Sequence, residues 1–71
     1  MIGQIWKCYE DEKTYLFLNH YILDETDADN SELVVYRQWH YKAFCVELNR
    51  TFNFHLDIPV EDDEDYWKRL A

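Results

Sequence analysis

The stretch "TFNFHLDI" (Thr51–Ile58) has the plainest strand pattern in the sequence. Apolar residues occupy its even-numbered positions and polar residues its odd-numbered ones. A period of two is typical of a β-strand with one buried face and one exposed face. The side chains that we expect to point inward are Phe52, Phe54, Leu56 and Ile58.

Most of the remaining chain also favours strands. Of its 71 residues 18% are aromatic, which suits one small domain with an aromatic core. The further strands are expected at residues 3–9, 14–23, 33–41 and 43–48. The core is expected to contain Phe52, Phe54, Leu56, Val35, Val46 and Leu16.

The period changes in the tail, "PVEDDEDYWKRLA" (Pro59–Ala71). Tyr66, Trp67 and Leu70 have helical spacing, carboxylates come first, and two basic residues come near the end. This charge order complements a helix macrodipole. The tail therefore predicts a short amphipathic α-helix over about residues 60–70 that packs its apolar side on the sheet.

Gly3, the segment "ELVVYR" (Glu32–Arg37), and Val46 followed six residues later by Phe52 resemble a small bacterial family of unknown function. The resemblance covers roughly residues 3–56 and implies an SH3-like barrel. We therefore expect one mainly β domain, a small five-stranded SH3-like barrel over about residues 3–58 with the short C-terminal helix. The departures from the family are Cys45 in place of Trp, Glu47-Leu48 in place of Arg-Pro, and the acidic insert Asp24–Ser31.

The charge is strongly negative and unevenly distributed. Seven basic and 15 acidic residues give a net charge of −8. Residues 24–32 hold five acids and no base, and residues 57–71 hold six acids and two bases. Because phosphate contacts require Lys and Arg, we expect direct binding neither to nucleic acid nor to an anionic membrane.

The sequence offers no constellation for catalysis. No export signal is expected at the start of the chain, so we expect a cytoplasmic protein whose two cysteines, Cys8 and Cys45, are reduced. The three histidines lack the close spacing of a local zinc chelate, although His20 and His55 could meet across the sheet. Gly3 is the only glycine, so no phosphate-binding loop is present. No enzyme activity and no cofactor are predicted.

The acidic insert has a partial calcium-loop pattern. Asp27, Asp29 and Ser31 fall at ligand positions one, three and five. The sixth position, normally Gly, is Glu32, and the twelfth, normally Glu, is Gln38. A weak cation site is an alternative, and a solvated acidic loop is the simpler interpretation.

The clustered carboxylates favour a role in binding. Many carboxylates on one face can imitate a phosphate array and occupy a basic groove. We therefore expect a non-catalytic inhibitor, of the kind that phages or other mobile elements encode, which blocks the nucleic-acid-binding groove of a host protein. The expected binding residues are Asp24, Glu25, Asp27, Asp29, Glu32, Glu61, Asp62, Asp63, Glu64 and Asp65.

Three alternatives stay open. The charge can simply keep an aromatic-rich protein soluble. The domain can be a housekeeping adaptor that binds a peptide or protein through aromatic side chains. It can also be an antitoxin-like subunit whose tail inserts into a partner. The candidate adaptor residues are Trp6, Trp39, Tyr36 and Tyr41.

Overall fold

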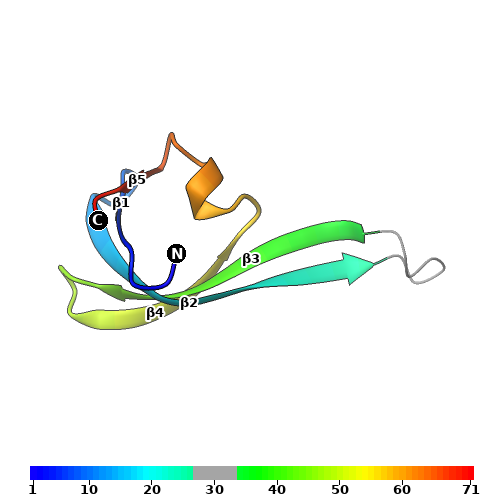
Figure 1. Ribbon diagram of the computed structural model, residues 1–71, viewed down its shortest axis with the longest axis horizontal. Helices are drawn as coiled ribbons and strands as arrows, with labels where there is room; N and C mark the ends of the chain where they lie inside the picture. Colours follow the sequence, from blue (N-terminus) through cyan, green and yellow to red (C-terminus); the bar gives the residue numbers. More distant parts are fainter. Residues whose placement is uncertain (27–33) are drawn as a thin grey trace.

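The computed structural model describes residues 1–26 and 34–71 as one antiparallel sheet (Figure 1). This confirms the mainly β class. The total of five strands also agrees, but two of the expected strands form one and the fifth strand lies in the tail. The elements are β1 (Ile5–Cys8), β2 (Lys13–Thr26), β3 (Val34–Cys45), β4 (Arg50–Leu56), the 3-10 turn η1 (Val60–Asp62) and β5 (Trp67–Arg69). No helix in these two ranges has the length and apolarity to cross a membrane.

The strand order is β4-β3-β2-β1-β5. The first four strands follow one another as a meander, and β5 returns to the outer side of β1. β4 and β5 are thus the two edges, and the sheet does not close within the described residues. The expected SH3-like barrel is therefore not confirmed.

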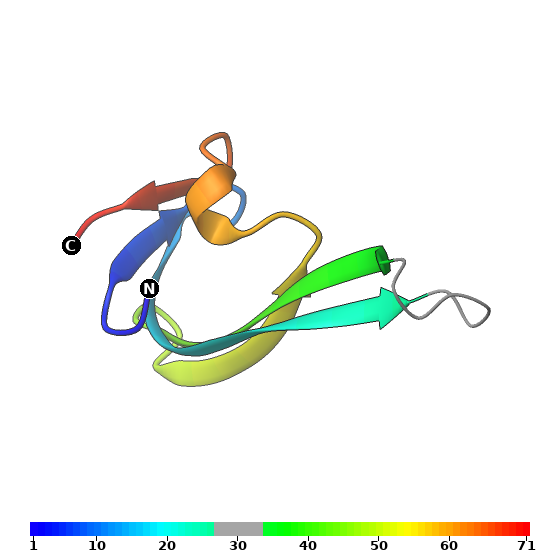
Figure 2. The same ribbon diagram turned by 45° about the vertical axis from the view of Figure 1, so that its right-hand side comes forward.

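The longest element is the hairpin of β2 and β3, with strands of 14 and 12 residues. Its far part extends beyond the other strands as an arm, and the molecule measures 45 × 23 × 18 Å (Figures 1 and 2). The strand register shifts between Phe17 and Asn19, which is a β-bulge. The remainder of the sheet, with η1, forms the body of the molecule.

The core of the body is built from aromatic rings. Phe17 is fully buried, and its ring meets Tyr41 at 5.3 Å and Trp67 at 5.7 Å between centroids, both edge to face. Edge-to-face pairs add stability beyond the area they bury. The buried cluster consists of Trp6, Cys8, Phe17, Tyr41, Ala43, Val60 and Trp67.

The predicted register of β4 is confirmed. Phe52, Phe54 and Leu56 are half-buried, whereas Asn53 and His55 are exposed. Two core predictions were wrong: Val46 is 53% exposed and Ile58 is 52% exposed. Both lie just past the end of a strand, so sheet alternation no longer sets where they point. The core prediction for Leu16 was also wrong: Leu16 is half-buried, but it alternates with Tyr15 and Phe17 and lies on the face away from the core cluster. The side chain of Val35 lies outside the described residues.

The expected strands at residues 33–41 and 43–48 form one element, β3. Lys42 is exposed while its neighbours Tyr41 and Ala43 are buried. Alternation thus continues through the polar position.

The predicted C-terminal helix over residues 60–70 was wrong. The tail forms the single turn η1, and Trp67–Arg69 pairs with β1 as β5. Trp67 is buried, whereas Tyr66 and Leu70 are each 50% exposed. A helix this short is marginal in isolation, and pairing satisfies backbone groups along the edge of β1. Tertiary pairing therefore outweighs the helical spacing of the apolar residues.

The Tyr41 hydroxyl accepts a buried hydrogen bond from the N–H of Val60 at 2.9 Å. Tyr41→Phe should lower the free energy of unfolding by about 1–3 kcal/mol, because it leaves that amide without its partner. Tyr21→Phe is the matched control, since Tyr21 is 58% exposed, and should change stability by no more than about 0.5 kcal/mol. Urea unfolding measures both, and equal effects would contradict this role of Tyr41.

Candidate functional site

The acidic segment Glu61–Asp65 is held between two buried anchors. Val60 before it is fully buried, and Trp67 after it is 8% exposed. The carbonyl of Asp63 accepts hydrogen bonds from the N–H groups of Tyr66 at 3.2 Å and Trp67 at 3.0 Å, which turns the chain back toward β1. Four of its five acids are exposed and Asp63 is half-buried. The carboxylates are therefore presented on a turn fixed at both ends.

A second acidic turn, Glu10–Glu12, lies beside this segment. It connects β1 to β2 and is exposed throughout. The N–H of Tyr9 donates to the carbonyl of Tyr66 at 2.7 Å, and Cys8 pairs with Trp67 in the sheet. Figure 2 shows the two connections at the same end of the body. We call Glu10–Glu12 and Glu61–Asp65 together the acidic end.

The sequence did not assign Glu10–Glu12 to a binding surface. The segment has the composition of a connecting turn, and nothing in it indicates the tail as a neighbour. The missing information is the pairing of β5 with β1, because the tail was expected to be helical. The signal that was present is the charge itself, three consecutive acids at residues 10–12.

Asp11 is the one acid of this turn with defined hydrogen-bond partners. Its Oδ1 accepts the N–H of Lys13 at 2.9 Å, and its Oδ2 accepts the hydroxyl of Tyr15 at 2.6 Å. Partial burial acts to raise the pKa of Asp11, but the hydrogen bonds from Tyr15 and Lys13 outweigh it and the pKa is lowered. Burial and the bond to Asp11 raise the pKa of Tyr15. The turn is thereby fastened to the start of β2.

The other predicted cluster contributes less among the described residues. Arg37 binds Asp24 through two hydrogen bonds, Nε to Oδ1 at 2.6 Å and Nη2 to Oδ2 at 2.9 Å. The bond from Arg37 lowers the pKa of Asp24 and compensates its charge. Glu25 is exposed and lies one position further along β2, so it points to the opposite face.

The remaining predicted acids of that cluster, Asp27, Asp29 and Glu32, lie outside the described residues, as does the partial calcium pattern. Asp24 and Glu25 lie near the end of β2, which is the far end of the arm, whereas η1 lies over the body (Figures 1 and 2). Within the described residues the two clusters are not brought together.

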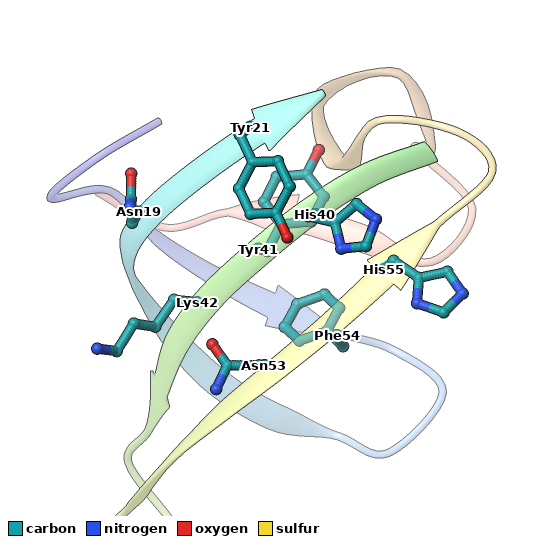
Figure 3. Close-up of a pocket in the computed structure, with 8 residues that line it drawn as sticks. All are labelled: Asn19, Tyr21, His40, Tyr41, Lys42, Asn53, Phe54 and His55. Atoms are coloured by element: carbon teal, nitrogen blue, oxygen red, sulfur yellow. The ribbon is translucent and has the colours of Figure 1, made fainter. Parts of the chain in front are cut away.

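The outer face of the sheet carries a shallow pocket of about 220 Å³ (Figure 3). The rings of His40 and His55, paired across β3 and β4, are 5.2 Å apart, and Tyr21 stacks on His40 at 4.7 Å. His55 thus meets His40 rather than His20, the residue that the sequence suggested. The volume is below the roughly 300–1,000 Å³ of typical small-molecule sites. Its lining is Asn19, Tyr21, His40, Tyr41, Lys42, Asn53, Phe54 and His55.

Groups suited to nucleophilic or metal chemistry are not gathered in the described part of the chain. Cys8 and Cys45 are both buried, and burial raises the pKa of the Cys8 thiol. A raised pKa keeps a thiol neutral, which is the opposite of activation. No three His, Cys, Asp or Glu side chains in residues 1–26 and 34–71 are grouped to hold a metal ion.

The aromatic residues considered for an adaptor surface are mostly not available. Trp6 is 8% exposed and Tyr41 is 4% exposed, so both belong to the core. Trp39 is half-buried against that core. Tyr36 is exposed, and its hydroxyl donates a hydrogen bond to Asp57.

Comparison of the chain with protein-family models, curated proteins and solved structures finds no match. The resemblance to the small bacterial family therefore stays a prediction.

The two hydrogen bonds to Asp11 predict a pH-dependent contribution to stability. The pKa of Asp11 is lowered in the folded chain, so the contribution is full above the unfolded pKa of about 3.9 and is lost as pH falls through the folded value. Asp11→Asn should lower stability at pH 7, and the difference from the parent should shrink below about pH 4. Urea unfolding at pH 7 and pH 3 measures it. Glu10→Gln is the control, and an Asp11→Asn effect that does not depend on pH would contradict the role of the charge.

Proposed function

We propose that this protein is a non-catalytic acidic binding protein that uses its acidic end to occupy a basic, nucleic-acid-binding groove of a partner protein. The observation that carries the proposal is the hydrogen bond between Tyr9 and Tyr66, which holds two acidic turns side by side. Eight carboxylates, three from residues 10–12 and five from residues 61–65, thus meet at one end of the body. This is more charge than a turn needs for its own stability.

Rigidity supports a recognition role over a role in solubility alone. A soluble surface needs charge but no fixed arrangement of it. Here both acidic turns are tied to the core, one through Val60 and Trp67 and the other through Asp11. A turn whose backbone is already anchored loses little conformational entropy on binding, which favours affinity. Duplex DNA carries one charge per about 1.7 Å of axis, so an imitation of it depends on many charges close together.

The acidic end differs from the surface that the sequence suggested. The sequence pattern alone combines residues 24–32 with residues 61–65. In the proposed surface Glu10–Glu12 takes the place of the first cluster, whose Asp24 is already paired with Arg37. The inhibitor hypothesis itself is retained: a bound acidic end would exclude nucleic acid from the groove.

The fold of this binder is proposed to be an incompletely closed SH3-like barrel. The strand order supports it, since β1 lies between β2 and β5. The position of η1 directly before β5 supports it as well. An SH3-like adaptor that binds a peptide is the second candidate function, and the observation in its favour is the outer-face pocket with Tyr21 stacked on His40.

Two triple substitutions of equal charge test the proposal. The first is Glu61→Gln, Glu64→Gln and Asp65→Asn in the acidic end, and the second is Asp27→Asn, Asp29→Asn and Glu32→Gln in the insert. A partner captured from the source cytoplasm should bind the first variant about tenfold or more weakly, about 1.4 kcal/mol, with a smaller loss for the second. Titration calorimetry measures the affinities. Melting temperatures should stay close to that of the parent.

Competition separates nucleic-acid mimicry from other acidic recognition. Duplex DNA should compete with this protein for the groove of the captured partner and so dissociate the complex. Rising salt should also weaken the complex, because charge pairs at a rim are screened. If both triple variants bind like the parent and Tyr21→Ala does not, the adaptor function replaces the proposal. If DNA and the protein bind the partner simultaneously, the mimicry hypothesis is wrong.

A further inference from the structure

One edge of β2 is unpaired along the arm. Up to Phe17 the edge is covered, since Phe17 donates its N–H to Gln4 at 3.0 Å and accepts the N–H of Gly3 at 2.8 Å. From Leu18 to Thr26 the described residues provide no neighbour on that side, and β2 pairs only with β3. Nine residues of strand extend over about 30 Å. An edge of this length is a template for another strand.

Between the register shifts that bound it, this edge is protected only by the acids Asp24 and Glu25 near its far end. Native sheets discourage edge pairing with Lys or Pro at the edge. Residues 18–26 contain neither, and they contain no Arg. The other edge strands carry cations, Arg50 in β4 and Lys68 and Arg69 in β5. The exposed apolar side chains on the β2 edge are Leu18 (41%), Tyr21 (58%), Ile22 (53%) and Leu23 (48%).

Backbone donors of β2 face this open side. The N–H of His20 is bonded only locally, by the side chain of Asn19 at 2.9 Å. In an antiparallel strand every second residue directs its backbone groups to the same side. Ile22 and Asp24 therefore present their N–H and C=O groups to the open side together with His20.

We propose that this edge pairs with the same edge of a second copy of the chain, antiparallel, with the two-fold axis at Ile22. The register of β2 is regular between its shifts at Phe17/Asn19 and Glu25/Thr26. The regular stretch is Asn19–Glu25, and Ile22 is its centre. A two-fold interface requires a patch that is complementary to itself.

The sequence meets that requirement. Pairing about Ile22 places His20 opposite Asp24 of the second copy twice, so that an imidazole faces a carboxylate whose charge Arg37 of the same chain already compensates. It also places Tyr21 opposite Leu23 and Ile22 opposite itself, so apolar side chains meet at the centre. No pair of like charges results.

The geometry also accommodates a net charge of −8 on each copy. The arm extends away from the body (Figure 1). An antiparallel pair of arms therefore places the two bodies, and with them the two acidic ends, at opposite ends of the dimer. Repulsion between the acidic ends is small at such a separation, because a distance beyond about 8–10 Å is screened at physiological salt.

Sedimentation equilibrium of the full chain tests the proposal. The parent should form a dimer whose population rises with concentration up to about 1 mM. Ile22→Lys brings two like charges together at the axis and should weaken the dimer by about tenfold or more. Val46→Lys is the matched control, since Val46 has the same 53% exposure but lies beyond the end of β3, and should dimerise like the parent. A monomeric parent, or a dimer unaffected by Ile22→Lys, would overturn the proposal.

Cysteine cross-linking tests the register independently. Directly opposite residues in a hydrogen-bonded pair have Cα atoms about 5.5 Å apart, which suits a disulfide. Ile22→Cys should therefore form a disulfide-linked dimer on mild oxidation. Leu23→Cys should not, because its counterpart is displaced by two residues, about 7–8 Å away. The native Cys8 and Cys45 are buried. Equal cross-linking at both positions would show that the pairing is not centred on Ile22.

Discussion

The pairing of β5 with β1 is the interaction on which the rest of the structure depends. Through it Trp67 enters the core, where its ring contacts Phe17 and stacks on Phe54 at 6.0 Å. It also fixes both ends of β5, since the N–H of Leu70 donates to the carbonyl of Ile5 at 2.7 Å and the N–H of Tyr9 donates to the carbonyl of Tyr66. Without β5, the body would lose a buried tryptophan and β1 would lose its backbone partners on one of its two sides.

The same pairing connects the fold to the proposed function. Neither acidic turn is unusual by itself, since turns are commonly charged. The tail strand brings residues 61–65 beside residues 10–12 and holds them against a core that cannot easily rearrange. Concentrated negative charge at one end repels itself, and the buried anchors Val60 and Trp67 offset that repulsion. The repulsion within the acidic end thus lowers the stability of the fold, and solubility alone does not require charges that are so close together.

The sequence predicted the strands well where one face is apolar and the other polar. The alternation over Thr51–Ile58 gave the correct inward face of β4, because register is strongly specified when one face is buried. Alternation failed to predict burial just past the strand ends, where Val46 and Ile58 are exposed. The prediction also failed in the tail, where helical spacing competes with pairing as a strand. The spacing of Tyr66, Trp67 and Leu70 fits a helix. The segment forms a strand instead because the edge of β1 is available to pair with it. The acidic end depends on that long-range pairing, so local sequence could not predict it.

Two-dimensional NMR of the full chain tests the tail pairing most directly. A strand at Trp67–Arg69 predicts cross-strand contacts between Cys8 and Trp67 and between Lys7 and Lys68, the register pairs of β1 and β5. It also predicts slow hydrogen exchange at the Tyr9 and Leu70 amides, which donate across that pairing. Contacts from Asp65 to Lys68 and from Tyr66 to Arg69 that continue as a helical series, with rapid exchange at Tyr9, would contradict the pairing and the acidic end built on it.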